Sequence, residues 1–451
     1  MGFYRVAVFL LHLLVSVECD LTEKKPNLKA EVLSKTGMDI SELQELSKKD
    51  STPPPIILIP GDGGSQIEAK LNKTDVVHYL CDKHTEDFFD LWLNLELLVP
   101  LILDCWVDNM RLEYDNVTRT THNPEGVTTR VPGFGNTTTV EFLDPSNVSP
   151  SRYFIDVVKA LLDAEKKYKR GETILGAPFD FRRAPNELSE YFIELKKLIE
   201  DTYENQGKRR VVLLAHSMGS LVSVYFLNQQ SQSWKDKYVA CLVSLAGAFG
   251  GAVKALKVFA AGENLGIIVL SRKALRTEQM TSPSLAFLLP SRTFWNSSEV
   301  LVSRPSKNYT VNDYEEFFRD MNYSIGFEMW KDTSKLLADF PAPNVEIHCL
   351  HGYGINTIEQ VIYKKESNFP MDPDLIYGDG DGTVNIRSLQ GCLKFKEKQK
   401  QQVYHFPIKG AEHMEIIRDP QALQYLVKLV KTDKAMEMLR HLGSLKHKNA
   451  I

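Results

Sequence analysis

The chain has 451 residues, and its hydrophobic fraction of 43% and charged fraction of 25% are those of a folded globular protein. A formal net charge of −4 gives no reason to expect a nucleic-acid partner. The length allows one elaborated domain or two ordinary domains, and either can bury a large hydrophobic core.

Residues 1–19 have the features of a cleaved signal peptide. Arg5 precedes an apolar run from Val6 to Val17, and small residues follow at the end of that run. The run is too short to span a bilayer comfortably, although an uncleaved anchor is the alternative. The signal peptide predicts that the chain enters the secretory pathway. No other stretch reaches the ~18 uninterrupted apolar residues of a transmembrane helix.

Seven N-x-S/T sequences agree with this route, although some matches of so short a pattern arise by chance. If these asparagines carry glycans, they must lie on the surface of the folded protein. The predicted acceptors are Asn72, Asn116, Asn136, Asn147, Asn296, Asn308 and Asn322.

Five cysteines lie outside the signal region. An oxidising compartment favours disulfides, and the natural local pairs are Cys81 with Cys105 and Cys349 with Cys392. Cys241 lies inside an apolar run, so we expect it to be a buried thiol. A catalytic cysteine is the alternative, but nothing around Cys241 resembles a polar site.

Residues 20–55 form a polar, lysine-rich leader that ends in three prolines, with a short helix expected near residues 40–46. An apolar strand at residues 56–59 then ends in the glycine-rich turn Gly61–Gly64. A phosphate-binding loop is the alternative for this turn, but the Lys and Ser/Thr of a P-loop do not follow. In a serine hydrolase, a turn of this kind supplies half of the oxyanion hole.

Residues 88–106 are strongly apolar but are interrupted by Asp90, Glu96 and Pro100. They include tryptophans, which prefer a membrane–water boundary, and an ordinary core element is the alternative. A Cys81–Cys105 bridge would close this segment into a small subdomain, residues 81–128, that cannot bury all of its apolar surface. The predicted membrane-binding residues are Leu91, Trp92, Leu93, Leu95, Leu97 and Leu98.

Helices and buried strands alternate from about residue 151, which predicts a mostly parallel sheet with helices on both faces. The alternation is lost over residues 252–342, where we expect an inserted cap and lid. We assign residues 56–435 to this domain and residues 436–451 to a basic tail. The expected helices are residues 151–169, 186–206 and 420–441, and the expected strands are residues 211–214, 238–245, 345–350, 375–377 and 403–408.

The stretch Val211–Ser220 reads as a strand, a sharp turn and a helix, with Ser217 at the turn. A serine held there projects its hydroxyl above a parallel sheet, where a base can reach it. The usual pattern is G-x-S-x-G, and here Ala215 takes the first glycine position while Gly219 is kept. The alternative is a serine that only caps the helix.

The chain also contains an acid and a histidine in the order that α/β-hydrolases use, serine, then Asp or Glu, then His. His413 lies in a short loop after an expected strand. Asp379 and Asp381 both lie in the loop after residues 375–377, and the residues alone do not separate them. A Ca²⁺ loop is the alternative for these two aspartates, but its full pattern is not completed.

In these motifs the chain resembles the lecithin–cholesterol acyltransferase family, closest to its lysosomal branch, the group XV phospholipases A2, over residues 57–429. One departure is Ala246–Phe249, where members usually carry Gly-Ala-Pro-Trp, which bears on the acyl pocket or lid hinge. The segments that carry the resemblance are Val76–Cys81, Leu91–Leu97, Arg182–Pro185, Ala215–Gly219 and Gly378–Asn385.

The resemblance implies an α/β-hydrolase fold with an inserted membrane-binding subdomain and a cap. It implies the triad Ser217, Asp381 and His413, backbone N–H groups of Asp62 and Met218 as the oxyanion hole, and both disulfides. It implies no metal and no cofactor. A protonated Asp62 at low pH would no longer repel the developing oxyanion, which is our hypothesis for activity in an acidic compartment.

The function implied is that of a serine phospholipase A and transacylase, which passes a fatty acyl chain to water or to a lipid alcohol such as ceramide. The alternatives are a secreted phosphatidylcholine–sterol acyltransferase and a non-catalytic lipid-binding protein on a hydrolase scaffold. The implied partners are a phospholipid membrane or lipoprotein surface, and we expect a monomer. The implied destination is the lysosome or the extracellular space.

Overall fold

The computed structural model describes residues 53–431, apart from residues 101, 265–270, 366–368 and 370–371. The predicted signal peptide, most of the polar leader, the helix near residues 40–46 and the basic tail from residue 436 lie outside the described residues. Within the described ranges, no helix is long and apolar enough to cross a membrane.

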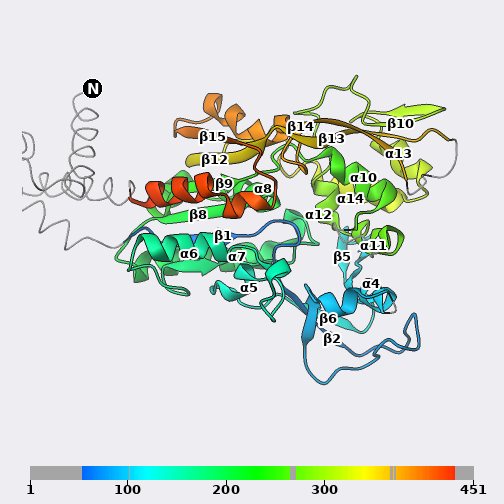
Figure 1. Ribbon diagram of the computed structural model, residues 1–451, viewed down its shortest axis with the longest axis horizontal. Helices are drawn as coiled ribbons and strands as arrows, with labels where there is room; N and C mark the ends of the chain where they lie inside the picture. Colours follow the sequence, from blue (N-terminus) through cyan, green and yellow to red (C-terminus); the bar gives the residue numbers. More distant parts are fainter. Residues whose placement is uncertain (1–52, 101, 265–270, 366–368, 370–371, 432–451) are drawn as a thin grey trace, which may run out of the picture.

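A six-stranded sheet in the order β15-β12-β9-β8-β1-β7 forms the centre of the molecule (Figure 1). All neighbouring strands are parallel, which confirms the expected sheet. Strands β1, β8 and β9 are buried at every position, as expected for apolar strands covered on both faces. The strands are β1 (Ile56–Ile59), β7 (Ile174–Gly176), β8 (Val211–His216), β9 (Val239–Leu245), β12 (Glu346–Tyr353) and β15 (Val403–Lys409).

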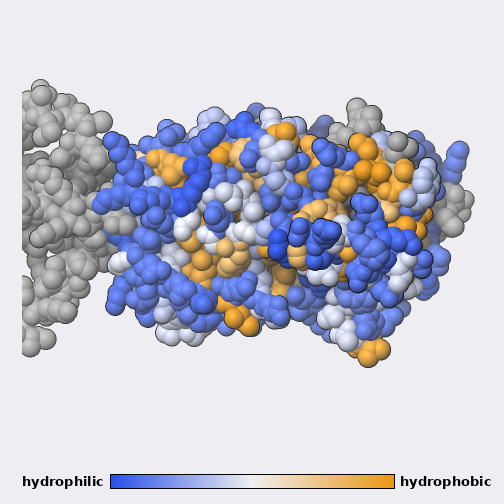
Figure 2. All heavy atoms as spheres, turned by 90° about the horizontal axis from the view of Figure 1, so that it is seen from below, coloured by the Kyte–Doolittle hydropathy of each residue, from blue (hydrophilic) through white to orange (hydrophobic). Residues whose placement is uncertain are grey.

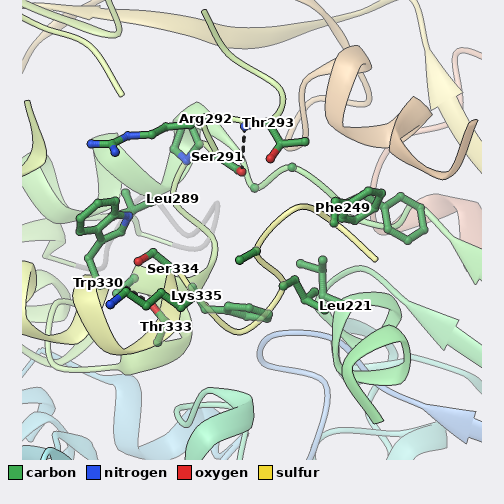
Figure 3. Close-up of a pocket in the computed structure, with 18 of the residues that line it drawn as sticks. Leu221, Phe249, Leu289, Ser291, Arg292, Thr293, Trp330, Thr333, Ser334 and Lys335 are labelled. Carbon is green, nitrogen blue, oxygen red and sulfur yellow. Dashed lines mark hydrogen bonds between the residues drawn. The ribbon is translucent and has the colours of Figure 1, made fainter. Parts of the chain in front are cut away.

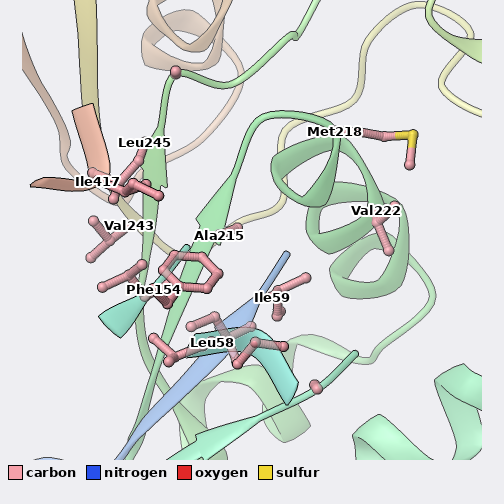
Figure 4. Close-up of a cluster of buried hydrophobic side chains, with 14 of the residues drawn as sticks. Leu58, Ile59, Phe154, Ala215, Met218, Val222, Val243, Leu245 and Ile417 are labelled. Atoms are coloured by element: carbon pink, nitrogen blue, oxygen red, sulfur yellow. The ribbon is translucent and has the colours of Figure 1, made fainter. Parts of the chain in front are cut away.

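Apolar side chains pack against both faces of this sheet (Figure 4). Met218 and Val222 come from helix α8 on one side, whereas Phe154 and Ile417 lie on the other. Each fully buried side chain of this size contributes about 1.5–3 kcal/mol through the hydrophobic effect, so this core fixes the positions of the strand ends.

The expected helices at residues 151–169 and 186–206 are present as α6 and α7 but are shorter. The chain leaves helix α6 after residue 164, and Tyr168 then packs into the core. Residues 420–431 are helical at the end of the described chain. The helices are α5 (Thr138–Glu141), α6 (Ile155–Ala164), α7 (Ser189–Asn205), α8 (Met218–Asn228), α9 (Gln232–Tyr238) and α15 (Ile386–Leu389), with the 3-10 segments η2 (Ser149–Ser151), η3 (Pro185–Glu187), η4 (Gln390–Glu397) and η5 (Glu415–Arg418).

The residues of the expected insertion form a second hydrophobic core and part of a four-stranded sheet, in the order β11-β10-β13-β14. We call this part the cap, and its role over the site stays a prediction. Its predicted end was residue 342, but two strands of this sheet come from later in the chain, beyond β12. The cap elements are α10 (Val253–Ala261), α11 (Arg272–Gln279), α12 (Pro283–Phe287), β10 (Val302–Arg304), β11 (Lys307–Tyr309), α13 (Tyr314–Asp320), α14 (Ser324–Thr333), β13 (Ile355–Ile362) and β14 (Asp374–Gly380).

A smaller part lies below the cap in Figure 1 and contains two more sheets. Both predicted disulfides are present, Cys81–Cys105 in this part and Cys349–Cys392 beside the central sheet. Cys241 is buried in β9, as predicted. The elements are β2 (Ile67–Leu71), β3 (Phe89–Trp92), η1 (Leu95–Leu98), α4 (Leu103–Met110), β4 (Glu113–Asp115), β5 (Thr120–His122) and β6 (Val127–Arg130).

The fully buried side chain of Arg182 ties this smaller part to the core around the central sheet. Its guanidinium pairs with Asp180 at 2.7 Å and donates to the carbonyl of Met110, at the end of α4, at 2.9 Å. A further N–H donates to Asn123 Oδ1 at 3.1 Å. Burial alone would raise the pKa of Asp180, but Arg182 and Arg183 outweigh it and hold that pKa below its ordinary value.

We expect Arg182→Met to lower the free energy of unfolding by about 3–5 kcal/mol, because it leaves the Asp180 carboxylate without its buried partner. The measurement is chemical denaturation with the disulfides intact. Lys169→Ala removes one side of the exposed Lys169–Glu172 pair and is the control, with an expected change within about 0.5 kcal/mol. A loss for Arg182→Met no larger than that of the control would contradict the anchoring role.

Candidate functional site

Ser217 lies on a strained turn between β8 and α8. Its φ of 53° is in the left-handed region, which costs about 1–3 kcal/mol for a residue with a side chain. A Cβ on Gly219 would overlap the carbonyl oxygen of Pro60, so only glycine fits there. The Ser217 side chain makes no hydrogen bond that caps α8, and the hydroxyl is therefore available for another partner.

That partner is His413, which joins Ser217 to Asp381. Ser217 Oγ lies 2.9 Å from His413 Nε2, and His413 Nδ1 lies 2.7 Å from Asp381 Oδ2. The three side chains are 8%, 7% and 0% exposed. The structure thus brings together residues that are 32 and 196 positions apart in the sequence. A serine with a base and an orienting acid in contact is the arrangement of a nucleophilic hydrolase.

The geometry separates the two candidate acids. Asp381 also accepts N–H groups from Thr383 at 3.1 Å and Val384 at 2.8 Å. Burial alone would raise the pKa of Asp381, but His413 and these N–H donors keep it below its ordinary value. Asp379 is exposed and instead accepts from the N–H of Gly354 at 2.6 Å. Asp381 is therefore the carboxylate that can orient the base.

The glycine-rich turn after β1 lies directly beside the serine. A Cβ on Gly61 would be 2.8 Å from Ser217 Cβ and 3.4 Å from its Oγ, so the close approach requires glycine. Met218 is the first residue of α8, where the backbone N–H has no acceptor within its own helix. The turn places Asp62 next to Gly61, and the oxyanion role of the N–H groups of Asp62 and Met218 stays a prediction.

Two carboxyl groups near this turn have raised pKa values. Asp62 is an exposed residue, but protein atoms surround its carboxyl, and this desolvation raises its pKa to about 6, against smaller lowering effects of the Gly63 N–H and His413. Burial raises the pKa of Glu278, on cap helix α11, to about 8, and Arg182 lowers it in part. Glu278 is therefore uncharged at neutral and acidic pH, whereas Asp62 changes its charge near pH 6.

The structure adds two residues that the sequence motifs did not single out. His216, directly before the serine, has both ring nitrogens in buried contacts, one of them with the hydroxyl of Tyr153 at 2.6 Å. Tyr153 lies 63 positions earlier in the chain. Only the motif position of His216 could have drawn attention to it.

A cavity of about 370 Å³ separates α8 from the cap (Figure 3). Leu221, one turn after Ser217, and Phe249, the last residue of the segment Ala246–Phe249, line its inner side. Arg292, Trp330 and the neighbouring cap residues form the opposite side. None of Ser217, Asp381 and His413 lines this cavity.

The predicted membrane-binding segment is less exposed than its sequence suggests. Leu91 is fully buried and Leu98 is 3% exposed, so the prediction that these two side chains contact a membrane is wrong. Trp106, expected at a membrane boundary, is also buried and donates its indole N–H to the carbonyl of Leu91 at 2.9 Å. A helix and a strand cover one another here, which a one-dimensional hydrophobic pattern does not reveal.

The four other predicted residues, Trp92, Leu93, Leu95 and Leu97, are half-buried against the core. The exposed apolar side chains lie beside them, on the loop before Cys81 and after η1, and Figure 2 shows hydrophobic surface at this end of the molecule. They are Val77, Tyr79, Leu80 and Val99, at 58%, 86%, 46% and 46% exposure. Contact with a membrane stays a prediction.

The predicted glycosylation sites lie on the surface of the protein, as modification by a glycan requires. All seven predicted glycosylation asparagines are exposed, and their modification stays a prediction. Among the residues that the structure describes, no group of three or more His, Cys, Asp or Glu side chains is placed to hold a metal ion.

The chain is similar to known lipid acyltransferases over most of its length. The family model described as lecithin:cholesterol acyltransferase matches residues 88–420. A rat protein described as lysosomal phospholipase A and acyltransferase is 45% identical over 389 residues, which cover 86% of this chain and 93% of the rat protein. A chicken phosphatidylcholine-sterol acyltransferase is 43% identical over 364 residues, covering 81% and 87% of the two chains.

Among solved structures, the chain is similar to one described as the Tle4–Tli4 complex, with a TM-score of 0.47 and 14% identity. The match covers 84% of this chain and 98% of the other.

We expect Asp62→Asn to change the pH dependence of ester cleavage. Near pH 5 most of the Asp62 carboxyl is protonated and uncharged, like the amide, whereas near pH 7.5 its negative charge would oppose the developing oxyanion. The ratio of the Asn variant's kcat/KM to that of the wild type should rise from about one near pH 5 to about threefold to tenfold near pH 7.5, the order of a solvent-screened charge interaction. The measurement uses a short, soluble p-nitrophenyl ester. A ratio that does not vary with pH would contradict the role of this charge.

Proposed function

The chain belongs to the lecithin:cholesterol acyltransferase family, and from this premise we propose that it is a serine-dependent phospholipase A and acyltransferase. The observation that carries the proposal is the continuous contact from Asp381 through His413 to Ser217. The proposed donor is a glycerophospholipid. Its fatty acyl chain is passed to water or to a lipid alcohol such as ceramide.

The first half of the reaction forms an acyl-enzyme. His413 Nε2 takes the proton of Ser217 while Oγ attacks the ester carbonyl carbon, and Asp381 stabilises the imidazolium that results. The backbone N–H groups of Asp62 and Met218 then stabilise the oxyanion. The ester C–O bond breaks, and His413 gives its proton to the leaving lysophospholipid oxygen.

The second half transfers the acyl group. Water or a lipid alcohol attacks the acyl carbon, His413 accepts its proton, and the bond to Ser217 Oγ breaks with return of that proton to the serine. Water is the default acceptor in an open site. Transfer to an alcohol therefore requires that the cap shield the acyl-enzyme from bulk water.

The apolar loop beside the Cys81–Cys105 disulfide supports a substrate drawn from a lipid surface. Its exposed residues Val77, Tyr79 and Leu80 project from a part of the protein that Arg182 anchors to the hydrolase core. Side chains of this type insert into the boundary between headgroups and acyl chains. The loop would thus hold the site against a phospholipid membrane or a lipoprotein.

We further propose that the chain passes through the secretory pathway and acts in the lysosome or outside the cell. The two disulfides suit an oxidising compartment. The rat relative is described as lysosomal, which supports a lysosomal destination for this chain. The chicken relative supports a second candidate function, acyl transfer from phosphatidylcholine to a sterol, because its identity of 43% is close to the 45% of the rat protein.

Product analysis tests these assignments. We expect phospholipid liposomes that contain ceramide to give lysophospholipid, free fatty acid and acylated ceramide, at about pH 5 and about pH 7.4, a range that brackets histidine titration. Ser217→Ala should lose at least about 10³-fold in both hydrolysis and transfer, because the acyl-enzyme cannot form. Liposomes with cholesterol in place of ceramide, with and without an apolipoprotein, test the sterol reaction. Lipid turnover that survives in Ser217→Ala would refute the enzymatic proposal.

A second prediction concerns the lipid surface. Leu80→Glu should weaken binding to sedimented liposomes about tenfold, because it places a charge where an apolar side chain enters the interface. Cleavage of a soluble p-nitrophenyl ester should not change, since the triad is untouched. Ile193→Glu is the matched control, because Ile193 is 70% exposed on α7, away from this loop. Equal liposome binding by both variants would argue against the loop as the membrane contact.

A further inference from the structure

A buried chain of hydrogen bonds runs behind the triad. The N–H of Gly61 donates to the Tyr153 hydroxyl at 3.0 Å, and that hydroxyl lies 2.6 Å from His216 Nδ1. His216 Nε2 lies 2.9 Å from the backbone carbonyl oxygen of His413. His216 and Tyr153 are each 1% exposed. Two side chains that take no part in the proposed chemistry thus join the turn at Gly61, the turn at Ser217 and the loop of His413.

The partners determine where each proton lies. A carbonyl oxygen only accepts hydrogen bonds, so His216 Nε2 must carry a proton and donate a hydrogen bond to the backbone carbonyl oxygen of His413. In the neutral ring Nδ1 is then an acceptor, and the Tyr153 hydroxyl donates to it. The hydroxyl oxygen keeps a lone pair for the N–H of Gly61. Each of these three hydrogen bonds therefore has a single possible donor and a single possible acceptor.

Burial keeps both side chains in this state. It lowers the pKa of His216 to about 3, an effect that the nearby His413 strengthens, and it raises the pKa of Tyr153. Both groups are therefore neutral in acidic and neutral solution. The bonds do not depend on the pH at which the protein works, unlike the charge of Asp62.

We propose that Tyr153 and His216 are positioning residues that hold the Gly61–Asp62 turn and the His413 loop in fixed relation to Ser217. This inference rests on the proposed function. The turn consists mostly of glycine and has few side chains of its own to hold it, and Gly61 N–H is the group through which Tyr153 fixes it. The opposite side of the turn is held at Gly63, whose carbonyl accepts the indole N–H of Trp92 at 2.8 Å.

Tyr153→Phe tests the proposal, because it removes only the hydroxyl that joins Gly61 to His216. We expect kcat for a soluble p-nitrophenyl ester to fall about tenfold to a hundredfold, since a small displacement of the oxyanion donors acts mainly on the transition state. KM should stay within about twofold. The rate at which a fluorophosphonate labels Ser217 should fall in parallel, because that reaction passes through a similar charged intermediate.

Tyr191→Phe is the matched control. Its hydroxyl is also buried and donates to a backbone carbonyl, that of Ala177, at 3.2 Å. The two variants should lose similar thermal stability, but Tyr191→Phe should keep the kcat of the wild type. A fall in kcat that only follows the loss of stability, equal in both variants, would overturn the positioning role.

A double-mutant cycle separates the chain of bonds from its single members. If Tyr153 acts through His216, adding Tyr153→Phe to His216→Ala should lower kcat by less than about twofold further. Fully additive losses would overturn the coupling. Wild-type protein that neither cleaves esters nor reacts with the fluorophosphonate would instead refute the proposed function, so the two failures can be told apart.

Discussion

The close approach of two backbone turns is the constraint on which the site depends. Strands β1 and β8 are neighbours in the central sheet, and the turns that follow them meet where Gly61 and Gly219 leave no room for a Cβ. Because parallel strands end at the same edge of a sheet, the nucleophile and the proposed oxyanion donors arise together from one packing contact. The cost is a strained serine, and the apolar core beneath the strands sustains it.

The local parts of this arrangement could be predicted from the sequence. The continuous apolar runs of β1, β8 and β9 indicated a buried parallel sheet, and the small residues around Ser217 indicated the turn. The order of serine, aspartate and histidine predicted the three side chains that the structure brings into contact. The choice between Asp379 and Asp381 could not be derived from the residues, because they are two positions apart in one expected loop. The structure places Asp379 in the exposed part of β14 and Asp381 just after this strand, where it is buried against His413.

Contacts between distant segments account for what the sequence did not show. Trp106 is a residue of the type that prefers a membrane boundary. In the structure it is buried, and its indole N–H donates a hydrogen bond to a backbone carbonyl on the neighbouring strand β3. Tyr153 becomes relevant only when the fold brings it to His216, and no local pattern marks it. In the same way, the cap was predicted too short because β13 and β14 return to its sheet after the central sheet has resumed.

That last feature bears on how proteins of this architecture can change. Asp381 directly follows β14, so the proposed acid of the triad is attached to the four-stranded sheet of the cap rather than to the central sheet. Replacing the whole cap as a block would therefore also replace the strand that leads to Asp381. A foreign cap grafted onto this core would have to keep the β13–β14 hairpin, because that hairpin positions Asp381.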